Sequence, residues 1–293
     1  MTFRLGPESV QGPRRLRIEH ATGFTYQGEV GASYNEARML PSSTDSQFVL
    51  SSQLDIEPST SVNQYVDYFG TRVAAFDVLA AHSALNITAR SLVEVRPRPF
   101  EPSGMDWAQL AQEAERQIAT VEMLGQTSRT APHPEVAGIA RSIADQHDRP
   151  ADAALAIARA IGDAVEYMHG ITGVHSTAAD AWVERKGVCQ DITHITLGAL
   201  RHVGIPARYV SGYLHPQANP EIGVPVSGES HAWVEWFAGD WQGFDPTNGV
   251  EIGDRHVLVG RGRDYNDVPP LRGVYAGPFK SDLHVKVTIT REA

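Results

Sequence analysis

The sequence contains a single cysteine, Cys189, in the motif Gly187-Val188-Cys189-Gln190-Asp191. It follows a short polar turn and begins an apolar run with helical spacing, so we expect it in the first turn of a helix. Unpaired backbone N–H groups and the positive end of the helix dipole lie there, and both favour a nucleophilic thiolate over a thiol. The alternative is an unreactive buried side chain, which is the common state of an isolated cysteine.

A nucleophilic cysteine needs a nearby base and a third group that holds the base. His231 begins one strand-like run and Asp245 ends the next, directly before a proline. If Ala238-Gly239-Asp240 is the loop of a hairpin, His231 and Asp245 are diagonal neighbours on one face, about 7–8 Å apart at the backbone. A loop of two or four residues would separate them unless a bulge intervened. Taken singly, His231 is as readily explained as a half-buried strand histidine, and Asp245 as a turn-forming aspartate.

The remaining histidines give no comparable pattern. His194 lies on the same expected helix as Cys189 but about 140° around it, so we interpret it as a capping or surface residue. The chain has no second cysteine, no His-Glu-x-x-His motif and no carboxylate cluster with ligand spacing. We therefore predict no metal site and no cofactor. No oxygen-rich loop resembles a calcium site.

The elements that would carry these residues fall into two zones. Residues 15–96 contain short alternating runs between turns, which is typical of an antiparallel sheet or sandwich. The proline-rich segment 96–102 can join neither a sheet nor a helix, so we interpret it as a linker. Helical spacing recurs at 106–118, 134–146, 151–167 and from 189 onward, and strand-like runs follow at 207–213, 231–237, 241–245 and 283–289.

Helices followed by strands favour an α+β fold over an alternating parallel sheet. We predict an N-terminal antiparallel β region at 1–98 and a core at 99–293, with helices over 105–202 packed on a sheet over 207–290. The stretch between Leu214 and Ser230 is rich in Pro, Gly and Ser, and it is a candidate gating loop.

Composition excludes several classes of function. The 293 residues carry a net charge of −10 and are 42% hydrophobic and 20% charged, as expected of a soluble globular protein. An acidic chain without a basic stripe is a poor partner for nucleic acid. No apolar run approaches the ~20 residues of a membrane span, and no secretory signal is visible. With one cysteine and no internal disulfide, we expect a cytoplasmic protein that does not associate with membranes.

Several motifs resemble the transglutaminase-like superfamily, and others resemble its bacterial branch. The core motifs are 187–191, 204–213, 231–235 and 245–248, the bacterial ones are Trp182 and 262–270, and those of the β region preceding the core are 33–41 and 67–70. The resemblance spans nearly the whole chain. It implies a papain-like or transglutaminase core after an N-terminal β region.

The resemblance also implies roles for individual residues. A Cys–His–Asp triad maps onto Cys189, His231 and Asp245. Around it, we expect Gln190, Asp191, Trp182 and Arg208 as oxyanion or supporting residues, and Trp233, Ser230 and Tyr213 in a substrate cleft. For Asp191 and Arg208, a solvated helix-end carboxylate and an edge-strand arginine are equally good interpretations, and aromatic residues on strands are more often core.

Three functions are compatible with this reading. The first is a cysteine peptidase or amidase that acts on a peptide or carboxamide bond through a thioester on Cys189. The second is a transglutaminase, an acyltransferase in which an amine replaces water. The third is a binding scaffold of the same fold without catalysis. For both enzymes we expect a peptide or protein substrate that carries an amide or glutamine side chain.

Overall fold

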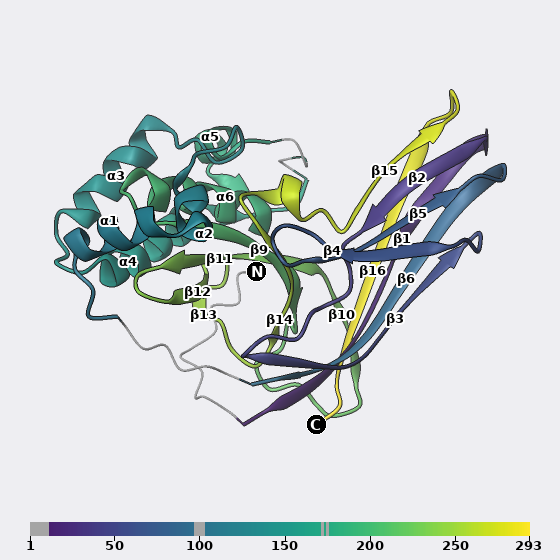
Figure 1. Ribbon diagram of the computed structural model, residues 1–293, viewed down its shortest axis with the longest axis horizontal. Coiled ribbons are helices and arrows are strands. Elements are labelled where there is room, and N and C mark those ends of the chain that lie inside the picture. The colour runs from purple at the N-terminus through teal and green to yellow at the C-terminus, as the bar shows by residue number, and fades with distance from the viewer. Residues whose placement is uncertain (1–11, 97–102, 171–172, 174–175) are drawn as a thin grey trace.

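The computed structural model describes residues 12–96, 103–170, 173 and 176–293. Helices gather at one end and long strands extend from the other (Figure 1). The α-helices are α1 (Trp107–Arg116), α2 (Ile118–Val121), α3 (Pro134–Ala144), α4 (Pro150–Ala164), α5 (Ala178–Glu184) and α6 (Cys189–His202). Short 3-10 helices lie at η1 (Glu122–Leu124) and η2 (Tyr265–Asp267). This mixed architecture confirms the predicted α+β class.

Two antiparallel sheets form the β region. One has the order β10-β16-β1-β6-β3 and the other β15-β2-β5-β4. Strict alternation of buried and exposed residues at the start of β1 shows why this sequence forms a strand with one buried face. The strands are β1 (Arg14–Val30), β2 (Ala32–Ala37), β3 (Gln47–Glu57), β4 (Val62–Val66), β5 (Arg72–Val78), β6 (His82–Val95), β10 (Pro225–Gly228), β15 (Leu271–Ala276) and β16 (Ser281–Arg291).

The chain returns to the β region at its C-terminal end, which differs from the sheet predicted over 207–290. β16 pairs antiparallel with β1, with Leu16 opposite Arg291, and β15 pairs with β2. β10, inside the predicted gating stretch, pairs with β16. The alternation of 283–289 identified the strand correctly. It carried no information on the partner, because the partner lies more than 250 positions away.

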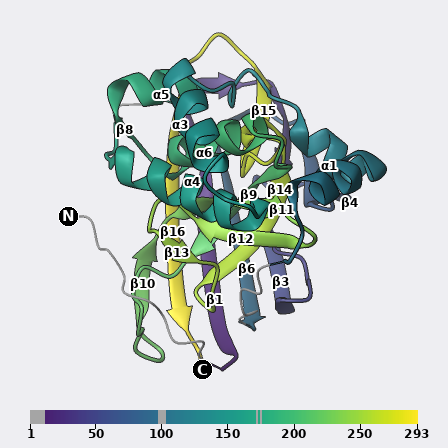
Figure 2. The same cartoon turned by 90° about the vertical axis from the view of Figure 1, so that its left-hand side faces the viewer.

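The helices pack on a third antiparallel sheet, the core sheet, of order β13-β12-β11-β9-β14. Figure 2 shows α3, α4 and α6 in front of these strands. Alternate residues of β11, among them Val234 and Trp236, bury their side chains in the core shared with α6. The strands are β9 (Ala207–Leu214), β11 (Ser230–Phe237), β12 (Trp241–Asp245), β13 (Val250–Glu251) and β14 (His256–Gly262), and β7 (Glu166–Tyr167) pairs separately with β8 (Lys186–Gly187).

The predicted hairpin is confirmed: Phe237 lies opposite Trp241 and Val234 opposite Phe244. Three of the predicted helices correspond to α1, α3 and α4 with small shifts at their ends. α5 was not predicted, although Thr177 and Asp180 form a capping box at its start. Most of the predicted linker, 97–102, lies outside the described residues. Within the described residues, no helix is both long and apolar enough to cross a membrane.

Candidate active site

Cys189 is the first residue of α6 and is partly exposed. Its neighbour Asp191 is buried, and Asp191 Oδ2 accepts the Val188 N–H at 2.8 Å, which caps the helix. Gly187 is required by this turn, because a Cβ atom there would lie 2.8 Å from Asp191 Oδ2. The local sequence therefore places the sulfur among the first N–H groups of a helix, which lack intrahelical acceptors.

The hairpin brings His231 to Asp245. His231 Nε2 lies 2.7 Å from Asp245 Oδ2, and the two side chains are 10% and 0% exposed. The turn after β12 surrounds the carboxylate with donors: the backbone N–H groups of Thr247 and Asn248 bond Oδ1, and Asn248 Nδ2 bonds Oδ2 at 2.7 Å. A buried carboxylate with this many donors is held firmly in its ionised form.

Charge interactions link the three predicted triad residues. Burial lowers the pKa of His231, but the negative charge of Asp245 and contacts with Cys189 outweigh it and raise the pKa to about 10. Burial opposes ionisation of Asp245, yet His231 holds the pKa of this carboxyl well below its usual range. Because Asp245 engages Nε2, Nδ1 is the ring nitrogen that remains for Cys189. These contacts favour a charged His231 beside an ionised Asp245.

Two further residues at Asp245 were missed by sequence reasoning. Asn248 stands three positions after Asp245 in a proline-containing turn, which is a local signal that could have found it. His256 Nε2 lies 3.4 Å from Asp245 Oδ2 and is fully buried. His256 begins β14, which β11 and β9 separate from β12 in the sheet, so no short-range sequence pattern pointed to it.

The predicted supporting residues occupy different places. Gln190 is half-buried beside Cys189. The Trp182 indole N–H donates to Glu135 at 2.9 Å, and Arg185 covers the ring at 3.5 Å, so this donor is not directed at an oxyanion. Trp182 therefore supports α5 rather than the reacting atoms.

Arg208 supports the core sheet instead of the triad. It pairs with Glu235 on the neighbouring strand at 2.6 Å and lies 3.8 Å over the Trp241 ring. Arg261 binds the same carboxylate at 2.8 Å. Burial would raise the pKa of Glu235, but the two guanidinium groups lower it to about 2. The edge-strand arginine foreseen as an alternative is thus an interior ion-pair partner.

Of the predicted cleft residues, Ser230 is half-buried at the start of β11. Trp233 is buried with its ring against His256, and both line a cavity of about 780 Å³ whose wall includes Gln47. Tyr213 does not reach a cleft at the triad. Its hydroxyl donates to the Met39 carbonyl and contacts His20 inside the protein, which corrects the predicted position.

His194 also differs from its prediction. It is fully buried, its Nε2 accepts the Tyr265 N–H at 3.2 Å, and its ring lies 5.2 Å from that of Tyr209. Burial lowers its pKa to about 3, so it is neutral. The helical angle correctly turned it away from Cys189, but the opposite side of α6 is covered by β9 and η2 rather than by solvent. Within the described residues, no group of three or more His, Cys, Asp or Glu could hold a metal ion.

Models of two protein families match the chain. The bacterial transglutaminase-like N-terminal region matches residues 16–94, and the transglutaminase-like superfamily matches residues 137–246. The second match ends one residue after Asp245 and includes Cys189 and His231.

One relative extends this similarity over nearly the whole chain, and another matches a part of it. An uncharacterized protein of Mycobacterium leprae is 43% identical over 283 residues, covering 95% of this chain and 99% of the relative. A protein-glutamine gamma-glutamyltransferase of Pseudomonas aeruginosa is 33% identical over 113 residues, 34% of this chain and 17% of that protein. The crystal structure of a proposed cysteine protease from Cytophaga hutchinsonii has the same fold, with a TM-score of 0.74, 20% identity and coverage of 96% and 98%.

Proposed function

Because the chain belongs to the transglutaminase-like superfamily, we propose that it is a cysteine-dependent hydrolase that cleaves a peptide or carboxamide bond through a thioester on Cys189. The observation that carries this proposal is the contact of 2.7 Å between His231 Nε2 and the buried carboxylate of Asp245, on a ring whose pKa Cys189 also helps to raise. This contact supports a triad in which Cys189 is the nucleophile, His231 the base and Asp245 the group that orients the base.

The reaction follows from these contacts. The Cys189 thiolate attacks the carbonyl carbon, and an S–C bond forms while negative charge develops on the carbonyl oxygen. N–H groups at the start of α6, with that of Cys189 as the nearest donor, are suited to stabilise this charge. His231 then gives its proton to the departing nitrogen, the C–N bond breaks, and a thioester remains. Water, deprotonated by His231, attacks the thioester, which yields a carboxylic acid and restores the thiolate–imidazolium pair.

A second candidate is transfer of the acyl group to an amine, which would form a new amide instead of an acid. The partial similarity to the Pseudomonas aeruginosa protein-glutamine gamma-glutamyltransferase favours it. Both reactions use the same thioester and differ only in the second nucleophile. A scaffold without catalysis is the third candidate. Burial of a carboxylate beside a charged histidine is costly, because both groups lose their hydration. A scaffold without catalysis would gain nothing from maintaining this pair.

A peptide-trapping experiment tests the proposal and separates the candidates. The protein is incubated with a library of glutamine-containing peptides, quenched in acid and analysed by mass spectrometry. We expect an acyl adduct on Cys189 that hydroxylamine removes, and released peptides that end in a new acid or carry glutamate in place of glutamine. With monodansylcadaverine present, dansylated products would favour acyl transfer. The absence of any adduct and product across the library would support the scaffold.

A further inference from the structure

The carboxylate of Asp245 binds two histidines, of which the mechanism above uses only His231. The second, His256, has no exposed side-chain surface, and its Nε2 lies 3.4 Å from the same oxygen, Oδ2. His256 Nδ1 accepts the Gly253 N–H at 3.2 Å. A neutral imidazole that accepts at Nδ1 carries its proton on Nε2, so His256 donates to Asp245.

Neutrality of His256 matters for its effect on the pair. Burial lowers its pKa despite the bond to Asp245. A neutral donor fixes the position of the carboxylate without neutralising it, so Asp245 keeps its negative charge for His231. His256 joins His231 and Asn248 as a third donor to Oδ2, which further restricts rotation of the carboxylate and holds Oδ2 toward the His231 ring.

The strand that carries His256 is held from outside the core. Among the described residues, β14 is the edge strand of the core sheet, and no strand pairs with its outer backbone groups. The buried side chain of Gln47, at the start of β3, fills this role: Oε1 accepts the Leu258 N–H at 2.8 Å and Nε2 donates to the Leu258 carbonyl at 2.7 Å. Gln47 Nε2 also donates to the Ser42 carbonyl at 2.7 Å, which fixes the amide within the β region.

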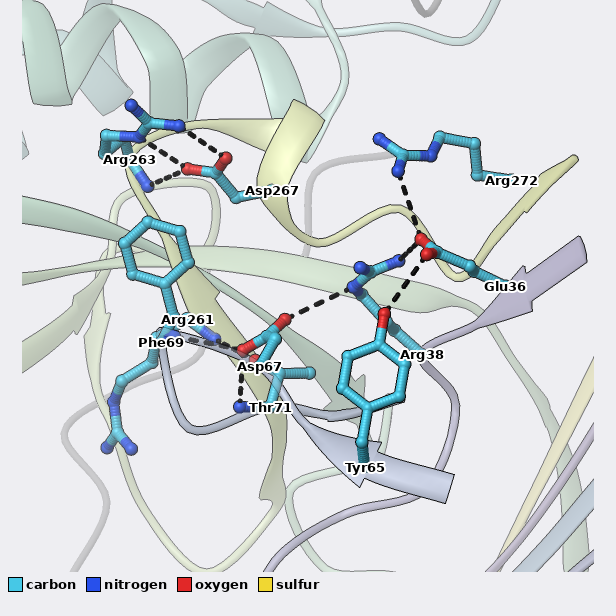
Figure 3. Close-up of polar contacts among 10 residues, drawn as sticks. All are labelled: Glu36, Arg38, Tyr65, Asp67, Phe69, Thr71, Arg261, Arg263, Asp267 and Arg272. Carbon is cyan, nitrogen blue, oxygen red and sulfur yellow. Dashed lines mark hydrogen bonds and ion pairs between the residues drawn. The ribbon is translucent and has the colours of Figure 1, made fainter. Parts of the chain in front are cut away.

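A second contact from the β region supports the same strand. Thr71 Oγ1 accepts the Arg261 N–H at 3.3 Å, and a Cβ atom at Gly260 would come within 2.8 Å of Thr71. Figure 3 shows Thr71 beside Arg261, in a loop whose Asp67 accepts N–H bonds from Phe69 and Thr71 and contacts Arg38. The β region therefore contacts β14 on both sides of the bulge between Leu258 and Gly260, through Gln47 at Leu258 and through Thr71 at Arg261.

We propose that His256 is a positioning residue for the Asp245–His231 pair, and that the N-terminal β region holds it in place through Gln47. This inference rests on the proposed function. It assigns the β region a part in the reaction. By holding β14, the β region fixes the position of the Asp245 carboxylate, which orients His231.

The test uses the rate at which iodoacetamide alkylates Cys189 at pH 6, which requires no knowledge of the substrate. His256→Phe keeps the ring volume but removes both polar contacts, and we expect a rate about 10- to 100-fold lower, the range for loss of a hydrogen bond to a charged group. His256→Gln retains a donor near Nε2 and is expected to recover most of the rate. If His256 served folding alone, His256→Phe and His256→Gln proteins that are equally folded would react at the same rate.

Gln47→Leu probes the route from the β region. We expect a rate about 10-fold lower, because the hydrogen bonds that hold Leu258 are lost. The double variant His256→Phe/Gln47→Leu should be no slower than His256→Phe alone, because both act through one contact. Tyr65→Phe is the matched control: it removes a bond from exposed Tyr65 to Glu36 in the same region and should leave the rate unchanged.

The outcomes separate this inference from the proposed function. If wild-type Cys189 itself reacts slowly at pH 6, the proposed thiolate–imidazolium pair is wrong. If the wild type reacts fast and His256→Phe matches it, or if the two substitutions add independently, the positioning role is wrong while the pair remains.

Discussion

Replacement of Cys189 by alanine is expected to eliminate both the acyl adduct and product release. Cys189 is the only cysteine in the sequence, and without its sulfur no thioester can form. Loss of the nucleophile of a triad typically lowers the rate by about 10⁴-fold or more. Initial rates measured with a peptide identified by trapping, together with intact mass, will test this. Cys189→Ser should behave in the same way, because serine lacks the acidity of a thiol at neutral pH.

Stability provides the control for this prediction. Cys189 is partly exposed at a helix start, so alanine creates no large cavity, and we expect the melting temperature and circular dichroism to stay close to those of the wild type. An inactive but folded variant supports the nucleophile. A folded Cys189→Ala variant as active as the wild type would contradict the mechanism.

Replacement of Asp245 by asparagine is the second large effect that we expect. Asparagine keeps the shape but loses the charge that raises the pKa of His231. It also offers an amide donor to a ring nitrogen that itself donates, so the histidine is driven to the wrong tautomer. The turnover number should fall about 10⁴-fold, the size of effect seen when a triad carboxylate is neutralised.

The same substitution should weaken the fold in a pH-dependent way. The folded-state pKa of Asp245 lies below its unfolded value, so the carboxylate contributes stability above about pH 3.9 and loses it as the pH falls further. We therefore expect Asp245→Asn to reduce the free energy of unfolding by about 3–5 kcal/mol at pH 7, and by less at pH 3. Urea titrations at both values will measure this. Asp77→Asn, the same change at an exposed position of β5, is the matched control. Equal effects of the two substitutions would contradict the account.

Local patterns predicted much of this site. The turn around Gly187 and the apolar spacing after Cys189 placed the sulfur at a helix start, as observed. The loop Ala238-Gly239-Asp240 set the parity of the hairpin and so the face that His231 and Asp245 share. In both cases the determining interactions lie within about 15 residues, where spacing translates directly into geometry.

What the sequence did not predict depends on contacts between distant segments. The pairing of β16 with β1 follows from the closing of the β region, and no alternation pattern encodes its partner. His256 meets Asp245 only because β14 adds to the sheet beside β9. His194 and Tyr213 were placed wrongly for one shared reason: their polar groups find partners inside the protein, on Tyr265 and Met39, that lie far away in sequence.

The coupling between Cys189 and His231 is the central claim, and the pH dependence of alkylation tests it most directly. With its pKa raised to about 10, His231 stays charged from pH 6 to 9, so the proposed thiolate–imidazolium pair would persist and the wild-type alkylation rate should change little over this range. In His231→Gln the sulfur should behave like a free thiol, which is mostly protonated below about pH 8.5, and react on the order of 100-fold more slowly than the wild type at pH 6. Equal rates at pH 6 in the two proteins, with the same steep rise toward pH 9, would contradict the account.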